Sequence, residues 1–382
     1  MNSRKLKIKK SLQVLSIIIL LLAFTGCTNT AITTDSNSSS SGKTSDLQVH
    51  FIDVGQGDCT LITSDGKAML IDAGNNDKGT LVQSYLQHQG ISTLDVVICT
   101  HGDSDHSGGM DVVLTKFDCK TIIMPDTDKV MSDTKTFRDV LSTMMSKGYK
   151  NTLPVVGNTF PLGNAVITII APNSYDYGDN SNDYSVGIIV QNGDNRFLFT
   201  GDAEESAEAD ILNNGIDISA DVFKVAHHGA NTANTDEFLE AINPAYAVIS
   251  CGEGNTYGHP RAEVLNKLRA ADTKVFRTDE QGTIVATSDG TDITWNCSPS
   301  DTWTAGEPTG NSSGTKAETD DKNSSTANNS SSIDELKVYV TDSGSKYHLA
   351  GCSYLSESSN ELSLKEAKKE GYTPCSKCNP PE

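Results

Sequence analysis

The sequence predicts an α/β (α+β) fold, a four-layer αββα sandwich in which two β-sheets lie between outer layers of helices. Two observations carry this prediction. Apolar, β-branched runs recur between residues 46 and 298 and alternate with amphipathic stretches. These runs also gather into two successive strand-rich halves. Two sheets of this kind bury their apolar faces best when they pack on each other and carry helices outside.

The first half is expected to begin with three strands and an amphipathic helix. The strands are expected at 47–54, 59–62, 68–74, 94–99 and 119–124, and the helices at 80–89, 110–117 and 134–148. Asp65-Gly66 is a hairpin turn signal between the second and third strands. Gly90 follows the first helix directly, where a glycine commonly ends a helix.

The second half continues with further strands and another helix. The strands are expected at 166–172, 181–190, 196–200, 221–225 and 245–251, and the helix at 261–271. We expect this domain to span 46–298, because residues 299–332 are Ser, Thr, Asn, Gly, Asp and Lys with little apolar content. Such a composition predicts a disordered linker.

The stretch Thr100 to Gly109 holds the densest group of reactive side chains. His101, Asp103, Asp105 and His106 fall within six consecutive positions. They follow an apolar run that reads as a buried strand, and ligands at the carboxyl end of such a strand sit where open α/β sheets place their sites. The alternative is a polar loop that happens to carry two histidines.

Together with residues 51–58 (FIDVGQGD) and 70–74 (LIDAG), this motif resembles the metallo-β-lactamase fold, and within it the ComEC-like hydrolase branch. The superfamily motif is usually His-x-His-x-Asp-His. Asp103 stands here where the second histidine is common, and ComEC-like domains share that aspartate. The histidine of the family's third motif is absent, and Asn182 or Ser185 occupies that region.

The resemblance implies two divalent metals. His101 and Asp103 would bind one metal and Asp105 and His106 the other, with Asp202 bridging them and His228 or His259 completing the shells. Asp72 would orient a metal-bound histidine from behind. With fewer nitrogen ligands and more oxygen, the shells shift the preference from zinc toward manganese, so both Zn²⁺ and Mn²⁺ remain candidates.

The implied chemistry is metal-assisted hydrolysis, in which the metals lower the pKa of a water molecule and hold the attacked group. The catalytic candidates are Asp105, His227 and His259, with one of the two histidines protonating the leaving oxygen. Lys224 could neutralise a phosphate oxygen or be a surface lysine at a strand end. Asp53 and Asp58 are interpreted as turn residues only.

The N-terminal residues predict export. A basic segment, an apolar run at 12–24 and the sequence Phe24-Thr25-Gly26-Cys27 resemble a bacterial lipoprotein signal, in which Cys27 is lipidated. Residues 28–45 would be a flexible tether. The protein would then be extracytoplasmic and attached to the cell membrane through the lipid alone. A plain secretory signal or an uncleaved anchor are the alternatives.

The last segment, 333–382, is expected to be a small metal-binding module. His348, Cys352, Cys375 and Cys378 offer one His and three Cys for a structural tetrahedral Zn²⁺. Fifty residues bury little apolar surface, so a metal is physically expected. The segment resembles the small metal-binding module of the Ada protein. The alternative is disulfide bonding with one spare thiol.

These features predict a cell-surface phosphodiesterase or nuclease. The resemblance implies single-stranded DNA as substrate, while another phosphodiester, such as wall phosphorylcholine or teichoic acid, is the enzymatic alternative. A non-catalytic binding protein is the second class. The net charge of −20 argues against a broad basic surface that grips nucleic acid. The Asp103 pattern and the missing histidine argue against a β-lactamase.

Overall fold

The computed structural model describes residues 46–130, 134–306, 337–341, 344–348 and 359–375. The chain divides into two compact units, one ending at Asn311 and the other beginning at Ser312, and each is described by itself. The predicted signal with Cys27 and the tether lie outside the described residues. Within the ranges just given, no helix has the length and apolar character needed to cross a bilayer.

The large unit contains two mixed β-sheets. In spatial order, the first sheet consists of β15 (Ile293–Trp295), β14 (Ile284–Ser288), β1 (Leu47–Phe51), β2 (Thr60–Ser64), β3 (Lys67–Ile71), β4 (Thr93–Ile98), β5 (Asp118–Ile123) and β6 (Asn151–Thr152). The second consists of β13 (Lys274–Arg277), β12 (Tyr246–Ile249), β11 (Val222–Lys224), β10 (Asn195–Phe199), β9 (Gly187–Asn192), β8 (Ala165–Ala171) and β7 (Thr159–Leu162).

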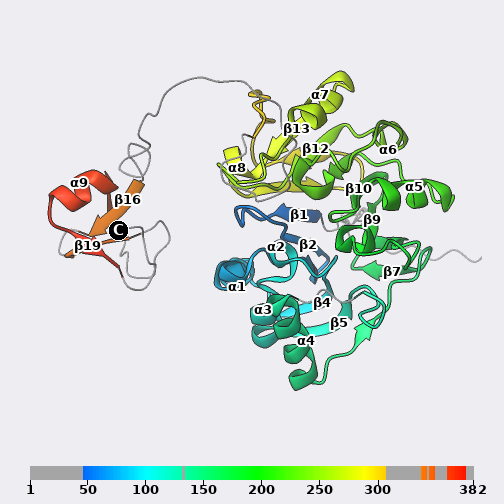
Figure 1. Ribbon diagram of the computed structural model, residues 1–382, viewed down its shortest axis with the longest axis horizontal. Coiled ribbons are helices and arrows are strands. Elements are labelled where there is room, and N and C mark those ends of the chain that lie inside the picture. Colours follow the sequence, from blue (N-terminus) through cyan, green and yellow to red (C-terminus); the bar gives the residue numbers. More distant parts are fainter. Residues whose placement is uncertain (1–45, 131–133, 307–336, 342–343, 349–358, 376–382) are drawn as a thin grey trace, which may run out of the picture. The chain divides into compact units, whose positions relative to one another are not determined.

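Helices cover the outer face of each sheet (Figure 1). The first sheet carries α1 (Gly79–His88), α3 (Met110–Lys116) and α4 (Lys135–Lys147), whose apolar side chains join one buried cluster with that sheet. The second carries α5 (Glu205–Asn213), α6 (Asp236–Ile242) and α7 (Ala262–Ala270). The remaining turns are η1 (Asn76–Lys78), α2 (Ser104–Ser107), η2 (Ser181–Tyr184), η3 (Ala226–Gly229) and α8 (Thr278–Gln281).

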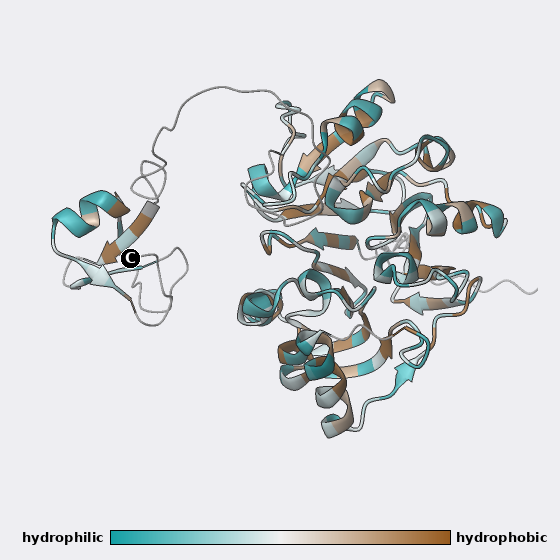
Figure 2. Ribbon diagram, in the orientation of Figure 1, coloured by the Kyte–Doolittle hydropathy of each residue, from teal (hydrophilic) through white to brown (hydrophobic). Residues whose placement is uncertain are grey.

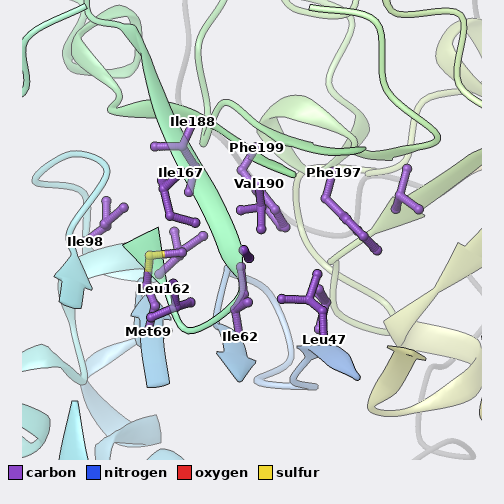
Figure 3. Close-up of a cluster of buried hydrophobic side chains, with 14 of the residues drawn as sticks. Leu47, Ile62, Met69, Ile98, Leu162, Ile167, Ile188, Val190, Phe197 and Phe199 are labelled. Atoms are coloured by element: carbon purple, nitrogen blue, oxygen red, sulfur yellow. The ribbon is translucent and has the colours of Figure 1, made fainter. Parts of the chain in front are cut away.

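The central core lies between the two sheets. Met69 from the first sheet and Ile167 and Phe199 from the second belong to one cluster of fully or nearly fully buried side chains. Figure 3 shows side chains of both sheets pointing into this space. The outer helices are two-sided, with apolar residues inward and polar residues outward, as the colouring of α7 and α4 shows (Figure 2). The predicted αββα sandwich is therefore confirmed.

Local signals placed helix α4 accurately. The Thr134 hydroxyl accepts a hydrogen bond from the Phe137 backbone N–H, which caps the first turn. Gly148 ends the helix in the left-handed conformation, with φ 72°. The expected strand at 181–190 is wrong in its first part, because residues 181–184 form the short helix η2 and β9 begins only at Gly187. The side chain of Asn180 caps η2 by accepting from the Asn182 N–H.

The large unit also extends beyond residue 298. The guanidinium of Arg269 lies 4.6 Å from the centre of the Trp303 ring. The Gly306 N–H donates to the Pro260 carbonyl at 2.9 Å. Residues 299–306 were expected to be linker, but they pack on the large unit, so its ordered part reaches at least residue 306. The low apolar content of residues 299–306 gave no indication of these two contacts.

Within its described residues, the small unit has a sheet of four strands, β18 (Ser359–Ser363), β16 (Lys337–Thr341), β17 (Lys346–His348) and β19 (Thr373–Pro374), and one helix, α9 (Leu364–Lys369). Ser363 and Glu366 form a reciprocal capping box at the start of α9. Val338, Tyr347 and Leu364 are among the apolar residues buried in this part of the unit.

Candidate metal centre

The polar residues of the predicted site follow the carboxyl ends of parallel strands in both sheets. Asp72 follows β3 and His106 lies after β4 in the first sheet. Asp202 follows β10 and His228 follows β11 in the second sheet. Parallel strands bring their carboxyl ends to the same edge of a sheet, and the two edges meet here. Residues far apart in the sequence are thereby brought together.

Four buried side chains form the centre of the site. One ligand atom from each of Asp58, His106, Asp202 and His228 lies within 4.8 Å of all the others. His106 Nε2 is 3.1 Å from Asp202 Oδ2 and 3.3 Å from His228 Nε2. His228 Nε2 is 3.3 Å from the same Asp202 oxygen. Two imidazole nitrogens and a carboxylate oxygen therefore converge on one small space.

Asp72 holds His106 from behind. Its Oδ2 lies 2.8 Å from His106 Nδ1 and accepts the Thr100 hydroxyl at 2.7 Å, while its Oδ1 accepts the Thr100 N–H. Asp72 is completely buried and has a left-handed φ of 56°, a conformation that costs a non-glycine residue energy and that its hydrogen bonds hold in place here. With Nδ1 engaged, His106 directs Nε2 toward Asp202. This is the arrangement in which a carboxylate orients a ligand histidine.

Asp58 and Lys224 correct two expectations. Asp58 was interpreted as a turn residue, but its side chain is buried, and Oδ1 lies 3.2 Å from His228 Nδ1. Lys224 is 2% exposed and its Nζ lies 2.8 Å from Asp58 Oδ2, so the surface-lysine alternative is wrong. Gly57 lets the turn before Asp58 approach the backbone of Asp105 closely, because a Cβ on Gly57 would lie 2.3 Å from the Asp105 carbonyl oxygen.

A second group of predicted ligands lines a more open side. The His101 ring lies 4.2 Å from that of His106, and its Nε2 is 3.9 Å from Asp103 Oδ2. Asp105 Oδ2 is 3.2 Å from His228 Nε2. The Asp103 and Asp105 side chains are 41% and 24% exposed. The structure thus brings all four residues of the 101–106 motif to the same site.

The third-motif region contributes three short polar side chains. Ser185 Oγ lies 3.3 Å from His101 Nδ1 and accepts the Asp202 N–H at 3.2 Å. Ser181, which the sequence did not single out, donates its hydroxyl to Asp103 Oδ1 at 2.9 Å. Asn182 donates instead to Glu204. The two serines thus support candidate ligand residues through hydrogen bonds, whereas Asn182 contacts Glu204.

His227 stands at the rim and is paired with Glu204. His227 Nδ1 lies 2.9 Å from Glu204 Oε1, and Nε2 lies 3.7 Å from Asp202 Oδ2. A carboxylate only accepts, so Nδ1 carries a proton and Nε2 faces the site. His227 and His228 both have left-handed φ values, 48° and 54°, which turn neighbouring rings in different directions. Glu204 was not predicted from the sequence. An indication of its role is its position two residues after Asp202.

His259 lies farther from the centre. Its ring is 5.5 Å from that of His227 and 6.1 Å from that of His228. Burial and the charges of those two histidines lower the pKa of His259 to about 3. His259 is therefore a neutral imidazole near neutral pH. In this form a ring nitrogen can donate a lone pair to a metal or accept a proton from a neighbouring group.

The charges of the central cluster depend strongly on one another. Burial opposes ionisation of Asp58, but Lys224 and His228 outweigh it and lower its pKa to about 2. Burial also opposes charge on His106 and His228, yet the surrounding carboxylates raise both pKa values well above the usual range. The carboxylates therefore favour positive charge within the central cluster.

The donor set fits a divalent metal. Within the described ranges, His101 Nε2, Asp202 Oδ1 and His259 Nδ1 are buried and have no hydrogen-bond partner. Leaving such atoms unsatisfied is costly. Asp202 belongs to the central cluster, and the rings of His101 and His259 lie 4.2 Å from that of His106 and 6.1 Å from that of His228. Imidazole nitrogens and carboxylate oxygens are ligands of Zn²⁺ and Mn²⁺. A cation would provide a partner for these buried atoms and would balance the negative charge of the carboxylates.

The predicted zinc site of the small unit is described only in part. His348 and Cys375 are 5% and 1% exposed. The Cys375 N–H donates to the Tyr347 carbonyl at 3.0 Å, which places Cys375 beside the strand that ends in His348. Cys352 and Cys378 lie outside the described residues. The four-ligand set stays a prediction.

Comparisons with known proteins agree with the fold. The model of the metallo-beta-lactamase superfamily matches residues 52–253. ComE operon protein 3 of Bacillus subtilis is 30% identical over 262 residues, which cover 63% of this chain and 33% of that protein. Recombination protein 2 of Haemophilus influenzae is 30% identical over 62% of this chain and 28% of its own length. Competence protein ComA of Neisseria gonorrhoeae is 27% identical over 61% and 31%.

The matched region spans about a third of each of these relatives. The family match covers both the 101–106 motif and the residues from the second sheet. The chain belongs to the metallo-β-lactamase superfamily.

Proposed function

We propose that the large unit is a metal-dependent phosphodiesterase or nuclease that works with two divalent cations, Zn²⁺ or Mn²⁺. The observation that carries the proposal is the cluster of Asp58, His106, Asp202 and His228, which is buried at its back and opens to solvent at its front through Asp103. A cluster of this kind can hold cations firmly and still admit a substrate.

His101 and Asp103, whose Nε2 and Oδ2 atoms lie 3.9 Å apart, would hold one cation. Asp105 and His106, which both approach His228 Nε2, would hold the other together with His228. Asp202 would be the carboxylate shared by the two cations. Divalent cations supply Lewis acidity at such a site and lower the pKa of water toward neutrality.

The chain's own residues then orient groups and move a proton. Asp72 fixes the ring of His106, and Glu204 fixes that of His227. His227 directs Nε2 into the site and is 22% exposed, so it can reach a leaving oxygen. We therefore assign His227, rather than the more remote His259, as the proton donor. Lys224 is engaged with Asp58 and stabilises that carboxylate instead of binding substrate.

A phosphodiester suits this site because its negative charge matches cations set among carboxylates. The names of the relatives, which include competence and recombination proteins, favour single-stranded DNA. A wall polymer such as teichoic acid, or phosphorylcholine on the wall, is the alternative. Cys27 would attach the enzyme to the outer surface of the membrane, and His348, Cys352, Cys375 and Cys378 would bind one structural Zn²⁺.

The test is metal content together with turnover of bis-p-nitrophenyl phosphate by the full chain, purified in detergent without chelator. We expect three metals per chain, and turnover that disappears in Asp105→Ala. Asp118→Ala is the matched control, since Asp118 is exposed at the amino end of β5, the end away from the site. A wild-type chain that holds one metal and has no turnover would overturn the proposal in favour of a binding protein.

The small unit needs its own variant. A Cys375→Ser/Cys378→Ser chain should lose one metal and keep the two of the large unit. An unchanged metal count would show that the zinc assignment is wrong. Because the readout is stoichiometry, this result does not depend on the reaction of the large unit.

A further inference from the structure

Three aromatic rings lead from the metal centre to the surface. The His259 ring lies 6.1 Å from that of His228, with 28° between their planes. The Tyr257 ring lies 5.7 Å from that of His259, with 22° between the planes. Such distances and angles are those of offset stacking. Exposure rises along the series, from 1% for His228 to 6% for His259 and 57% for Tyr257.

The loop that carries Tyr257 is braced. The Asn255 side chain donates to the Gly252 carbonyl and to the His259 carbonyl, and its oxygen accepts the His259 N–H at 3.0 Å. A Cβ on Gly252 would lie 2.5 Å from the Gln56 nitrogen, so this end of the loop packs directly on the first sheet's own loop. Tyr257 is therefore an exposed aromatic ring held in place beside the site.

The arginine in the cavity beside His259 is not free to bind a phosphate. This cavity has a volume of about 560 Å³ and is lined by Arg277. That guanidinium is paired with Asp279 at 2.7 Å and with Glu280 at 3.0 Å. The chain as a whole carries a net charge of −20. Affinity for a nucleic acid must therefore come from somewhere other than a basic surface.

We propose that Tyr257 is a stacking platform for a nucleobase of single-stranded nucleic acid whose phosphodiester lies at the Asp/His cluster. This inference rests on the proposed function and specifies its substrate class. The outer face of Tyr257 continues the ring series, and a base would add the next ring. Aromatic stacking is tolerant of sequence and provides binding where basic side chains are few. A wall polymer without bases could not use it.

The test compares two substrates of equal length and charge, an oligodeoxynucleotide with bases and an abasic one. For the wild type we expect kcat/KM to be about tenfold to a hundredfold higher with bases, the range expected for stacking one base. Tyr257→Ala and Tyr257→Leu should bring this ratio close to one, and Tyr257→Trp should preserve it. Met145→Ala is the control, because Met145 is 80% exposed on helix α4 and should leave the ratio unchanged.

The outcomes separate this inference from the proposed function. Turnover of both oligonucleotides by the wild type without a preference for bases overturns the stacking platform and leaves the phosphodiesterase standing. A preference that survives in Tyr257→Ala also overturns it. Absence of turnover of either oligonucleotide and of bis-p-nitrophenyl phosphate by the metal-loaded wild type overturns the proposed function itself.

Discussion

The back and the front of the site differ in burial and in what holds their side chains. At the back, every side chain is buried and bound by a second protein group; these residues are Asp58, Asp72, His106, Asp202 and His228. At the front, Asp103, Asp105 and His227 are 41%, 24% and 22% exposed. Rigid, dry ligands retain a cation, whereas exposed ligands allow water and substrate to approach. The difference predicts that substitutions at the back reduce metal binding and stability, and those at the front mainly turnover.

The largest effect should follow from the removal of a ligand at the back. We expect His106→Ala to lose metal and at least about a thousandfold in turnover, because a metal contributes several kcal/mol and each 1.36 kcal/mol is tenfold. Metal analysis and turnover measure both. His88→Ala, an exposed histidine on α1, is the control. Full turnover in His106→Ala would mean that the His106 ring binds no metal needed for the reaction.

The next effect concerns stability. Lys224→Met would leave Asp58 as a buried carboxylate without its ammonium partner, and such a loss costs about 3–5 kcal/mol. Denaturant unfolding of the metal-free chain measures it. Lys120→Met is the control, because Lys120 pairs with Asp95 at the surface and should change stability little. Equal stability of the two variants would show that the buried pair of Lys224 and Asp58 contributes no more to stability than a surface pair.

A smaller effect is expected from the group behind the ligand. Asp72→Asn keeps the shape of the side chain but weakens its hydrogen bond to His106 Nδ1, so metal affinity should fall by about 10- to 100-fold. A competition titration with a metal indicator measures this. Asp95→Asn, outside the site, serves as the comparison variant. Unchanged affinity in Asp72→Asn would show that packing alone orients His106.

The smallest effect belongs to the front. Glu204→Gln should lower kcat about tenfold, less than the 10²-fold or more that a proton donor itself contributes. The loss should be larger for an oligonucleotide than for bis-p-nitrophenyl phosphate, because p-nitrophenolate leaves without a proton. Glu205→Gln, exposed at the next position, is the control. Equal losses on both substrates would contradict proton donation by His227.

The sequence is most informative where one loop or one helix contains the whole pattern. His101 to His106 come from a single turn after β4, so their spacing alone indicates a candidate site. The ends of α4 are marked locally by Thr134 and Gly148. The polar run at 181–184 misled the strand prediction, because a short side-chain-capped helix has no periodicity to detect.

Asp58 and Glu204 could not be assigned from the sequence, because their roles depend on distant partners. Asp58 meets Lys224 and His228 only when the two sheets pack together. Glu204 meets His227 across a separate loop. The burial of Lys224 could not be predicted either, because a lysine at a strand end is usually exposed. The family resemblance indicated candidate metal ligands but not these supporting contacts.

The central cluster takes its members from both sheets, since Asp58 and His106 follow strands of the first sheet and Asp202 and His228 follow strands of the second. A cation bound there belongs to the native state alone, so its binding equilibrium is linked to unfolding. Metal at 100 times its dissociation constant would add about 2.7 kcal/mol to the stability of the fold. The melting temperature of this protein would then report how much free metal surrounds it.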